Sequence, residues 1–274
     1  MINKVAKHIR QGSIVNAVYN KAIGKEKRSK IIGYKRKIIG YKRNTYNLIK
    51  YGREAPRFGE IIWIYPHKQN YLLCQYAVNK YVGNKHSSAL VFDTSWPFKQ
   101  ATHLADFRKV AFCSNEWNKL DKQIPLDYRI KLKLKYCYEH WIDNVPFEKT
   151  GAYELRKMVL KIKGKWNLNG YNMDSIIQGY ENLDLIFEQV KREGRLRTKQ
   201  TSGKIHIGPS GETYFAGGAN HRFAIAHILK IPFPARIGCV HVSAIPYLKE
   251  YRCYVPDDSI SPRSYGKPPE KGSR

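Results

Sequence analysis

The chain lacks any long apolar run. No stretch of the 274 residues approaches the ~20 consecutive apolar residues that a membrane span needs, and the mean hydropathy is −0.55. The first 20 residues also lack the continuous apolar core of a secretory signal. Hydrophobic residues still make up 42% of the chain and aromatic residues 13%, which is too many for a disordered protein. We therefore expect a folded, soluble, cytoplasmic protein.

Cysteine is scarce and unpaired in sequence. The five cysteines form no CxxC pair, and an odd number argues against a closed disulfide framework. The nine histidines show no metal-ligand spacing. Cys239 and His241 stand two residues apart on an expected strand, but no second pair accompanies them. We expect no metal site, and the sequence gives no support to a metal-dependent nuclease.

Acidic residues are scarce relative to basic ones. The 22 Asp and Glu face 49 Lys and Arg, which gives a net charge of +27. Residues 1–57 hold 16 basic residues and only Glu26 and Glu54 as acids, a net charge of +14 in this segment alone. Such a basic arm is typical of proteins that bind nucleic acid or an anionic membrane surface. A lysine-rich composition shared by a whole genome would explain it equally well, and both interpretations are open.

The basic arm contains an internal repeat. The heptapeptide KIIGYKR occurs at 30–36 and again at 37–43. A helix over both copies would be amphipathic and basic. Gly33 and Gly40 would each weaken it by about 1 kcal/mol relative to Ala. We therefore favour a duplicated linker, with the helix as the alternative.

The remaining elements follow from hydrophobic periodicity and turn residues. Leu183, Ile186, Phe187 and Val190 give an apolar stripe of a helix that Gly194 ends. Asp174 could cap a separate helix through residue 180. We further expect strands at 60–66, 88–93, 108–112 and 234–242, helices at 127–141 and 152–163, and a hairpin over 205–215.

A glycine turn opens the last predicted helix. Gly217 and Gly218 permit positive φ and close backbone approach. Asn220 is a good helix cap, although Ala219 could also begin the helix. The first turn then presents free N–H groups at the positive end of the helix dipole, beside His221. This corner suits a phosphate or another anion, and plain strand–helix packing is the alternative.

The segment FAGGANHRFAIAHILKIPFPARIGCV resembles the phosphate-binding segment of the ParB/sulfiredoxin superfamily. Upstream, LDLIFEQVKREGRLRTK and IHIG resemble the helix, glycine and strand that precede it there. This similarity covers 174–242, about a quarter of the chain, and a wider one through APRFGEIIWIYP and EKTGAY resembles uncharacterised ParB-like proteins of bacteria and phages. The resemblance implies an α+β fold with a small mixed sheet and flanking helices, extended by an N-terminal α+β half and the basic arm. The expected organisation is a partly helical or flexible arm at 1–57, an N-terminal half at 58–173, the ParB/sulfiredoxin-like core at 174–250 and a disordered tail at 251–274.

The resemblance also implies a ligand. Members of this superfamily bind nucleotide phosphates at the start of the helix, so we expect a nucleoside triphosphate, ATP or CTP, with Mg²⁺, or another phosphorylated small molecule. In sulfiredoxin a cysteine precedes His-Arg, whereas Asn220 stands there in this chain, so no sulfur nucleophile is available. The glutamate that ParB often has there is also missing, and only ~32 residues after Val242 leave no room for the helical DNA-binding domain of ParB. The expected phosphate-binding residues are Gly217, Gly218, Ala219, Asn220, His221, Arg222, Arg195 and Arg197.

Whether the protein is an enzyme is open at this point. Phosphoryl transfer needs a carboxylate that holds metal or accepts a proton. Glu193 is the candidate catalytic residue because it ends the preceding helix, and Glu212 and Asp184 are second choices. With such a residue the protein would be an NTP-dependent phosphotransferase or NTPase. The alternative is a non-catalytic nucleic-acid-binding protein that acts through residues 1–57, with aromatic side chains interleaved among its charges.

Overall fold

The structure is a computed structural model that describes residues 25–82, 88–111, 126–167, 170–196 and 203–253. Contacts divide the chain into two compact units, 1–46 and 47–274, and each is described by itself. The described part of the first unit, 25–46, belongs to the 27-residue helix α2 (Lys25–Tyr51). The last residues of this helix, 47–51, are assigned to the second unit. Both copies of KIIGYKR lie within α2, so the favoured interpretation of the repeat as a linker is wrong and the helical alternative is correct. Among the described helices, none is both long and apolar enough to cross a membrane.

Seven strands in the described residues form one mixed sheet. The order is β1-β7-β5-β6-β2-β4, and β3 also pairs with β7. The nine-residue β7 organises the sheet, because it pairs antiparallel with β1 and parallel with both β5 and β3. The strands are β1 (Ile61–Ile64), β2 (Tyr71–Leu72), β3 (Leu90–Phe92), β4 (Thr102–His103), β5 (Lys204–Ile207), β6 (Thr213–Gly217) and β7 (Phe233–His241).

The hairpin expected over 205–215 is confirmed as β5 and β6. The Gly211 N–H donates to the carbonyl of Gly208, and Gly211 has a positive φ of 76°, which closes the turn. Glu212 fixes the turn further, since its carboxylate accepts hydrogen bonds from the Ser210 N–H and the Tyr214 hydroxyl. Glu212 therefore has a structural role in this hairpin.

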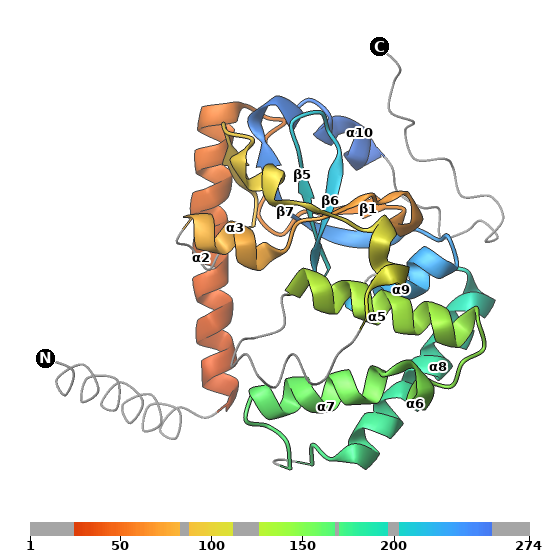
Figure 1. The fold of residues 1–274 in the computed structure, drawn as a ribbon. Helices are drawn as coiled ribbons and strands as arrows, with labels where there is room; N and C mark the ends of the chain where they lie inside the picture. The colour runs from red at the N-terminus through yellow and green to blue at the C-terminus, as the bar shows by residue number, and fades with distance from the viewer. Residues whose placement is uncertain (1–24, 83–87, 112–125, 168–169, 197–202, 254–274) are drawn as a thin grey trace, which may run out of the picture. The chain divides into compact units, whose positions relative to one another are not determined.

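Helices cover the sheet, with α5 to α9 gathered in one group (Figure 1). The expected helices at 127–141 and 152–163 are confirmed as α5 and α7, while PFEKTG contains the short α6. The α-helices are α3 (Gln75–Val82), α5 (Leu126–Trp141), α6 (Phe147–Thr150), α7 (Ala152–Ile162), α8 (Met173–Glu193), α9 (Asn220–Ile228) and α10 (Leu248–Cys253). The 3₁₀ helices are η1 (Pro66–Lys68), η2 (Trp96–Gln100), η3 (Ala105–Lys109) and η5 (Val242–Ala244).

The strand expected at 108–112 is wrong, because the described residues of this range, 108–111, form no strand. Residues Ala105–Lys109 form η3, in which the Phe107 N–H donates to the carbonyl of Leu104. This tight turn buries Phe107 and leaves the basic Arg108 and Lys109 exposed, which an extended strand would not do. Residue 112 lies outside the described residues. The disordered tail expected at 251–274 is wrong at its start, because residues 251–253 are helical, and 254–274 lie outside the described residues.

One continuous helix, α8, replaces the two helices expected between 174 and 190. Its cap is Asn172 rather than Asp174: the Asn172 side chain accepts from the Ser175 N–H, and the Ser175 side chain accepts from the Asn172 N–H. This reciprocal capping box satisfies two backbone donors at the helix start. Gly194 ends the helix with a positive φ of 66°, as the sequence predicted.

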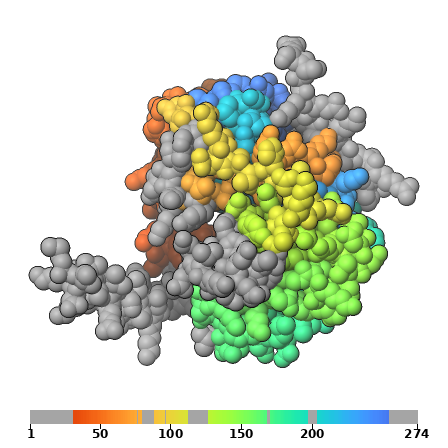
Figure 2. Space-filling model, viewed as in Figure 1, coloured from red at the N-terminus to blue at the C-terminus, as the bar shows by residue number. Residues whose placement is uncertain are grey.

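The sheet buries side chains on both faces. Phe215 of β6 points toward α9, where its ring stacks on Phe223 with centroids 3.7 Å apart. The preceding residue, Tyr214, belongs to a separate apolar cluster with Phe98 and Cys239, as strand alternation requires. In the space-filling view, the yellow and green segments from residue 88 to α7 form much of the visible surface of the second unit (Figure 2). The expected α+β class with a mixed sheet is confirmed.

Candidate functional site

The glycine turn expected after β6 is present. Gly217, Gly218 and Ala219 have φ values of 93°, 82° and 49°, so three consecutive residues adopt left-handed backbone. A Cβ on Gly217 would also lie 3.3 Å from Ile130 Cδ1, so the turn passes close to α5. Ala219 is the N-cap of α9 and makes no side-chain capping bond, and Asn220 is the first helical residue. The start of α9 is therefore capped by backbone geometry alone.

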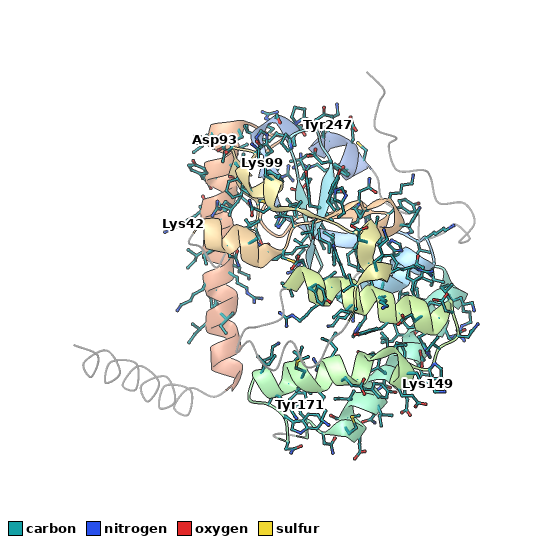
Figure 3. All side chains as sticks on the ribbon, in the orientation of Figure 1. Lys42, Asp93, Lys99, Lys149, Tyr171 and Tyr247 are labelled. Carbon is teal, nitrogen blue, oxygen red and sulfur yellow. The ribbon has the colours of Figure 1, made fainter. Side chains whose placement is uncertain are left out.

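A cavity of about 540 Å³ lies beside this helix start. Its wall combines α5, α7, the first turns of α8 and the first turn of α9. Figure 3 labels Lys149 of α6 and Tyr171, which precedes α8, both beside α7. The lining residues are Leu126, Arg129, Lys133, Leu155, Arg156, Val159, Lys163, Ser175, Ile176, Gly179, Tyr180, Asn220 and His221.

The polar part of this wall carries charge of one sign. Arg129 and Lys133 lie one turn apart on α5, and Arg156 and Lys163 come from α7 and the residue that follows it. The described lining residues include no Asp or Glu. Arg129 and Lys133 are half-buried, whereas Arg156 and Lys163 are exposed at the rim. Four basic side chains thus converge on one cavity with no acidic partner in its described wall.

These cations raise the cost of each other's charge. Burial, followed by the nearby charges of Arg156 and Arg129, lowers the pKa of Lys133 to about 8. Burial, followed by Arg129 and Arg156, also lowers the pKa of Lys163. Burial, followed by Lys133 and Arg156, lowers the pKa of His221 to about 3, so its imidazole is neutral at pH 7. A bound anion would relieve this repulsion.

Three of the lining residues have buried polar atoms with no hydrogen-bond partner among the described residues. These are Arg129 Nε, Asn220 Oδ1 and His221 Nε2. A buried donor or acceptor left unpaired costs ~1–3 kcal/mol. Arg129 offers an N–H to a ligand oxygen, and the neutral His221 ring can donate or accept at Nε2. Together they form a polar surface that a ligand could complete.

The rest of the wall is largely apolar. Leu126, Leu155, Val159, Ile176 and Tyr180 line it, and Gly179 adds bare backbone. The cavity can therefore accept a molecule that carries both anionic groups and an apolar or planar group.

The structure brings together part of the sequence-predicted site. Asn220 and His221 line the cavity, and Gly217, Gly218 and Ala219 form the turn that positions them. Arg222 follows in α9 but is not a lining residue, and it makes other interactions. Arg195 lies just after the end of α8, while Arg197 lies outside the described residues.

The candidate carboxylates lie elsewhere. Glu193 ends α8, thirteen residues beyond Tyr180 and therefore about 20 Å along the helix axis, and it accepts a hydrogen bond from Gln189. Asp184 accepts from Trp141 Nε1 and is within 3.1 Å of His140 Nε2. None of these carboxylates lines the cavity, and the described residues contain no group of three or more His, Cys, Asp or Glu that could hold a metal.

Sequence reasoning missed all four cavity cations. The available signal was Lys133, which interrupts the apolar stripe of Ile130, Leu134 and Cys137 on α5. A charged residue at a position that helical periodicity assigns to the interior is typical of a functional site. Arg156 could not be linked to Lys133 from the sequence, because only the packing of α5 and α7 brings them to one cavity.

Comparison with known proteins adds no assignment. A scan against protein-family models, a search of curated proteins and a search of solved structures each found no match.

Proposed function

We propose that the protein binds a nucleotide or another phosphorylated small molecule in the cavity beside the start of α9. The observation that carries the proposal is the convergence of Arg129, Lys133, Arg156 and Lys163 on one cavity whose described wall has no carboxylate. Desolvating like charges together is costly unless an anion compensates them. Phosphate groups suit these side chains because guanidinium groups bind them in bidentate fashion and ammonium groups as point charges.

The size and polarity of the cavity support a nucleotide over inorganic phosphate. Its volume of about 540 Å³ lies within the range of ~300–1,000 Å³ that small-molecule sites occupy. In the proposed arrangement the phosphates face the four cations and the start of α9, and the base or another planar group lies against Tyr180 and the aliphatic wall. The positive end of the α9 dipole adds to the attraction for phosphate. The glycine turn into α9 and its resemblance to the ParB/sulfiredoxin phosphate-binding segment agree with this arrangement.

The proposal is one of binding, with phosphotransfer as a second hypothesis. The described lining residues offer amines, guanidines, an imidazole, an amide and hydroxyl groups, but no carboxylate for Mg²⁺. This donor set does not fit a protein-held Mg²⁺, which prefers oxygen ligands including carboxylates. Among the described lining residues, Lys133, with its pKa of about 8, has the proton affinity that suits a general base near neutral pH.

A thermal-shift panel tests the proposed function. The probes are ATP, CTP, GTP, their diphosphates, pyrophosphate and inorganic phosphate, each with and without Mg²⁺. A ligand present at ~100 times its Kd should stabilise the folded protein by ~2.7 kcal/mol. We expect a nucleotide to exceed inorganic phosphate and to act without Mg²⁺. Equal stabilisation of wild type and the Arg129→Gln variant by every probe would show that the anion binds elsewhere.

Nucleic-acid binding through residues 1–57 stays a second candidate function. The observation that favours it is the charge of α2, which has ten basic residues and one acidic residue among 27. Such a helix attracts any polyanion, and the experiment on α2 below includes a duplex DNA probe for that reason.

A further inference from the structure

The heptapeptide repeat has a structural consequence because α2 is one continuous helix. Seven residues make nearly two helical turns, so side chains seven apart lie on the same face. Ile31 and Ile38 hold one such position, and Tyr34 and Tyr41 hold another, three residues further along. This spacing is that of the a and d positions of a coiled coil, with apolar residues at both. We call these four side chains the Ile–Tyr seam.

The seam is exposed on the described helix. Tyr34 is 67% exposed, Ile38 56% and Tyr41 74%, and Ile31 lies at 37%. Single exposed apolar residues are ordinary, but four on one face of a helix mark an interaction surface. The heptad spacing of these four side chains is that of a coiled-coil seam, which favours a helix as the partner.

Lysines border the seam on both sides. With Ile31 and Ile38 at position a, Lys35 and Lys42 hold e positions and Lys37 holds a g position, and all three are exposed. The Lys42 side chain stands out from α2 in Figure 3. Charges at e and g set partner choice in coiled coils, and like charges facing each other are unfavourable. A second copy of this helix would place lysines opposite lysines.

We propose that α2 docks an amphipathic helix of another protein, one with apolar residues at a and d and Asp or Glu at e and g. The apolar contacts would bury the Ile–Tyr seam, and the carboxylates would pair with Lys35, Lys37 and Lys42. Nucleic acid would use the same lysines, and its bases could stack on the two tyrosines, but it would not bury Ile31 and Ile38. The role of these isoleucines thus distinguishes the two partners.

A binding experiment with designed peptides tests the proposal on the full-length protein. Three of the probes are peptides: a synthetic helical peptide of four heptads with Ile and Leu at a and d and Glu at e and g, the same peptide with Lys at e and g, and a scrambled Glu peptide without heptads. The fourth probe is a duplex DNA. Fluorescence anisotropy at physiological salt gives each Kd. We expect the Glu heptad peptide to bind at least about tenfold more tightly than either control peptide.

Matched variants locate the surface. Ile38 belongs to the seam, so Ile38→Ser should raise the Kd of the Glu heptad peptide about tenfold or more. Ile32 is an exposed isoleucine outside the seam, so Ile32→Ser should leave this Kd unchanged. Lys35→Gln should raise the Kd of the Glu heptad peptide severalfold. Arg36→Gln removes the same charge from an exposed position that does not border the seam, so it should leave the Kd unchanged. Circular dichroism of each variant confirms that the helix is retained.

Three results would overturn the proposal. The first is equal binding of the heptad and scrambled Glu peptides. The second is duplex DNA binding more tightly than the Glu heptad peptide and with no change in Ile38→Ser, which would assign α2 to nucleic acid. The third is self-association in sedimentation that Ile38→Ser abolishes, which would make a second copy the partner.

Discussion

The imidazole of His221 lies against the ring of Tyr180, with ring centroids 5.8 Å apart and planes inclined by 56°. This contact joins the first turn of α9 to α8 across the wall of the cavity. Two residues that lie 41 apart in sequence thereby hold the glycine turn and the cation-bearing helices in one site. The cavity is thus built from tertiary packing as well as from the local motif.

Lys133→Met should stabilise the free protein and impair ligand binding. The substitution removes a charge that burial and two arginines disfavour, and methionine replaces its aliphatic stem. We expect the free energy of unfolding in urea to rise by about 1–3 kcal/mol, while the stabilisation by nucleotide is lost. A lysine with only a structural role would give the opposite sign, a loss of stability.

Ligand affinity should depend on the protonation of Lys133. Its pKa of about 8 in the free protein means that the side chain is charged below pH 8 and neutral above it. A bound anion favours the charged form, so the Kd for ATP or CTP should rise as pH increases from 7.5 to 9.5, by up to about tenfold per pH unit. The Lys133→Arg variant keeps its charge and should give a nearly flat profile. A flat profile in wild type would contradict the contact between Lys133 and the anion.

His221 should make the protein labile in acid. Its pKa of about 3 in the fold lies far below the value of 6.5 for an exposed histidine, so the unfolded chain binds the proton more tightly. The stability contributed by the neutral ring is complete above pH 6.5 and is lost as pH falls toward 3, at about 1.4 kcal/mol per pH unit. Lys133 and Arg156, which face the ring, add to the penalty for protonation.

The His221→Asn variant provides the control for that prediction. Urea unfolding of wild type and variant at pH 7, 6 and 5 gives the free energy of unfolding at each pH. This free energy should fall less in the variant, because the variant lacks the one proton that His221 takes up on unfolding. Parallel loss in both proteins would mean that His221 is not held neutral in the fold.

Two glycines at the site should respond oppositely to alanine. Gly217 has a φ of 93°, and a Cβ there would stand 3.3 Å from Ile130 Cδ1, so Gly217→Ala should destabilise the fold by about 1–2 kcal/mol. Gly179 is helical and a Cβ there meets nothing within 4 Å, so Gly179→Ala should stabilise α8 by up to about 1 kcal/mol. Thermal unfolding measures both, and destabilisation by Gly179→Ala would argue against the described packing of α8.

The sequence predicted the parts of this protein that depend on local physics. The stripe through Leu183 and Phe187 and the stop at Gly194 were readable because helical periodicity and a left-handed glycine are local signals. The hairpin and the glycine turn before α9 were readable for the same reason. The strand expected at 108–112 was wrong because a 3₁₀ helix there buries a single residue, Phe107, and this burial has no periodic signal in the sequence.

The site was only half predictable. Asn220 and His221 follow the glycine turn directly, so the local motif identified them. Arg129 and Arg156 lie on different helices, and nothing in the sequence links them until those helices pack. Arg222, which the motif placed on the phosphate, follows His221 in α9 and lies outside the lining. Local patterns thus found the helix start, and tertiary structure supplied the charge.

The most direct test of the central claim is the affinity for nucleotide of a matched pair of variants of α7. Arg156 lines the cavity, whereas Lys161 is an exposed cation on the same helix outside the lining. Isothermal titration with ATP and with CTP gives the Kd of the nucleotide that wild type binds. Arg156→Gln should raise this Kd by about 10- to 100-fold, because a charge-assisted contact is lost. Lys161→Gln should change the Kd less than about twofold, because an exposed charge outside the site contributes little. Equal losses in both variants, or none in either, would contradict a phosphate site in this cavity.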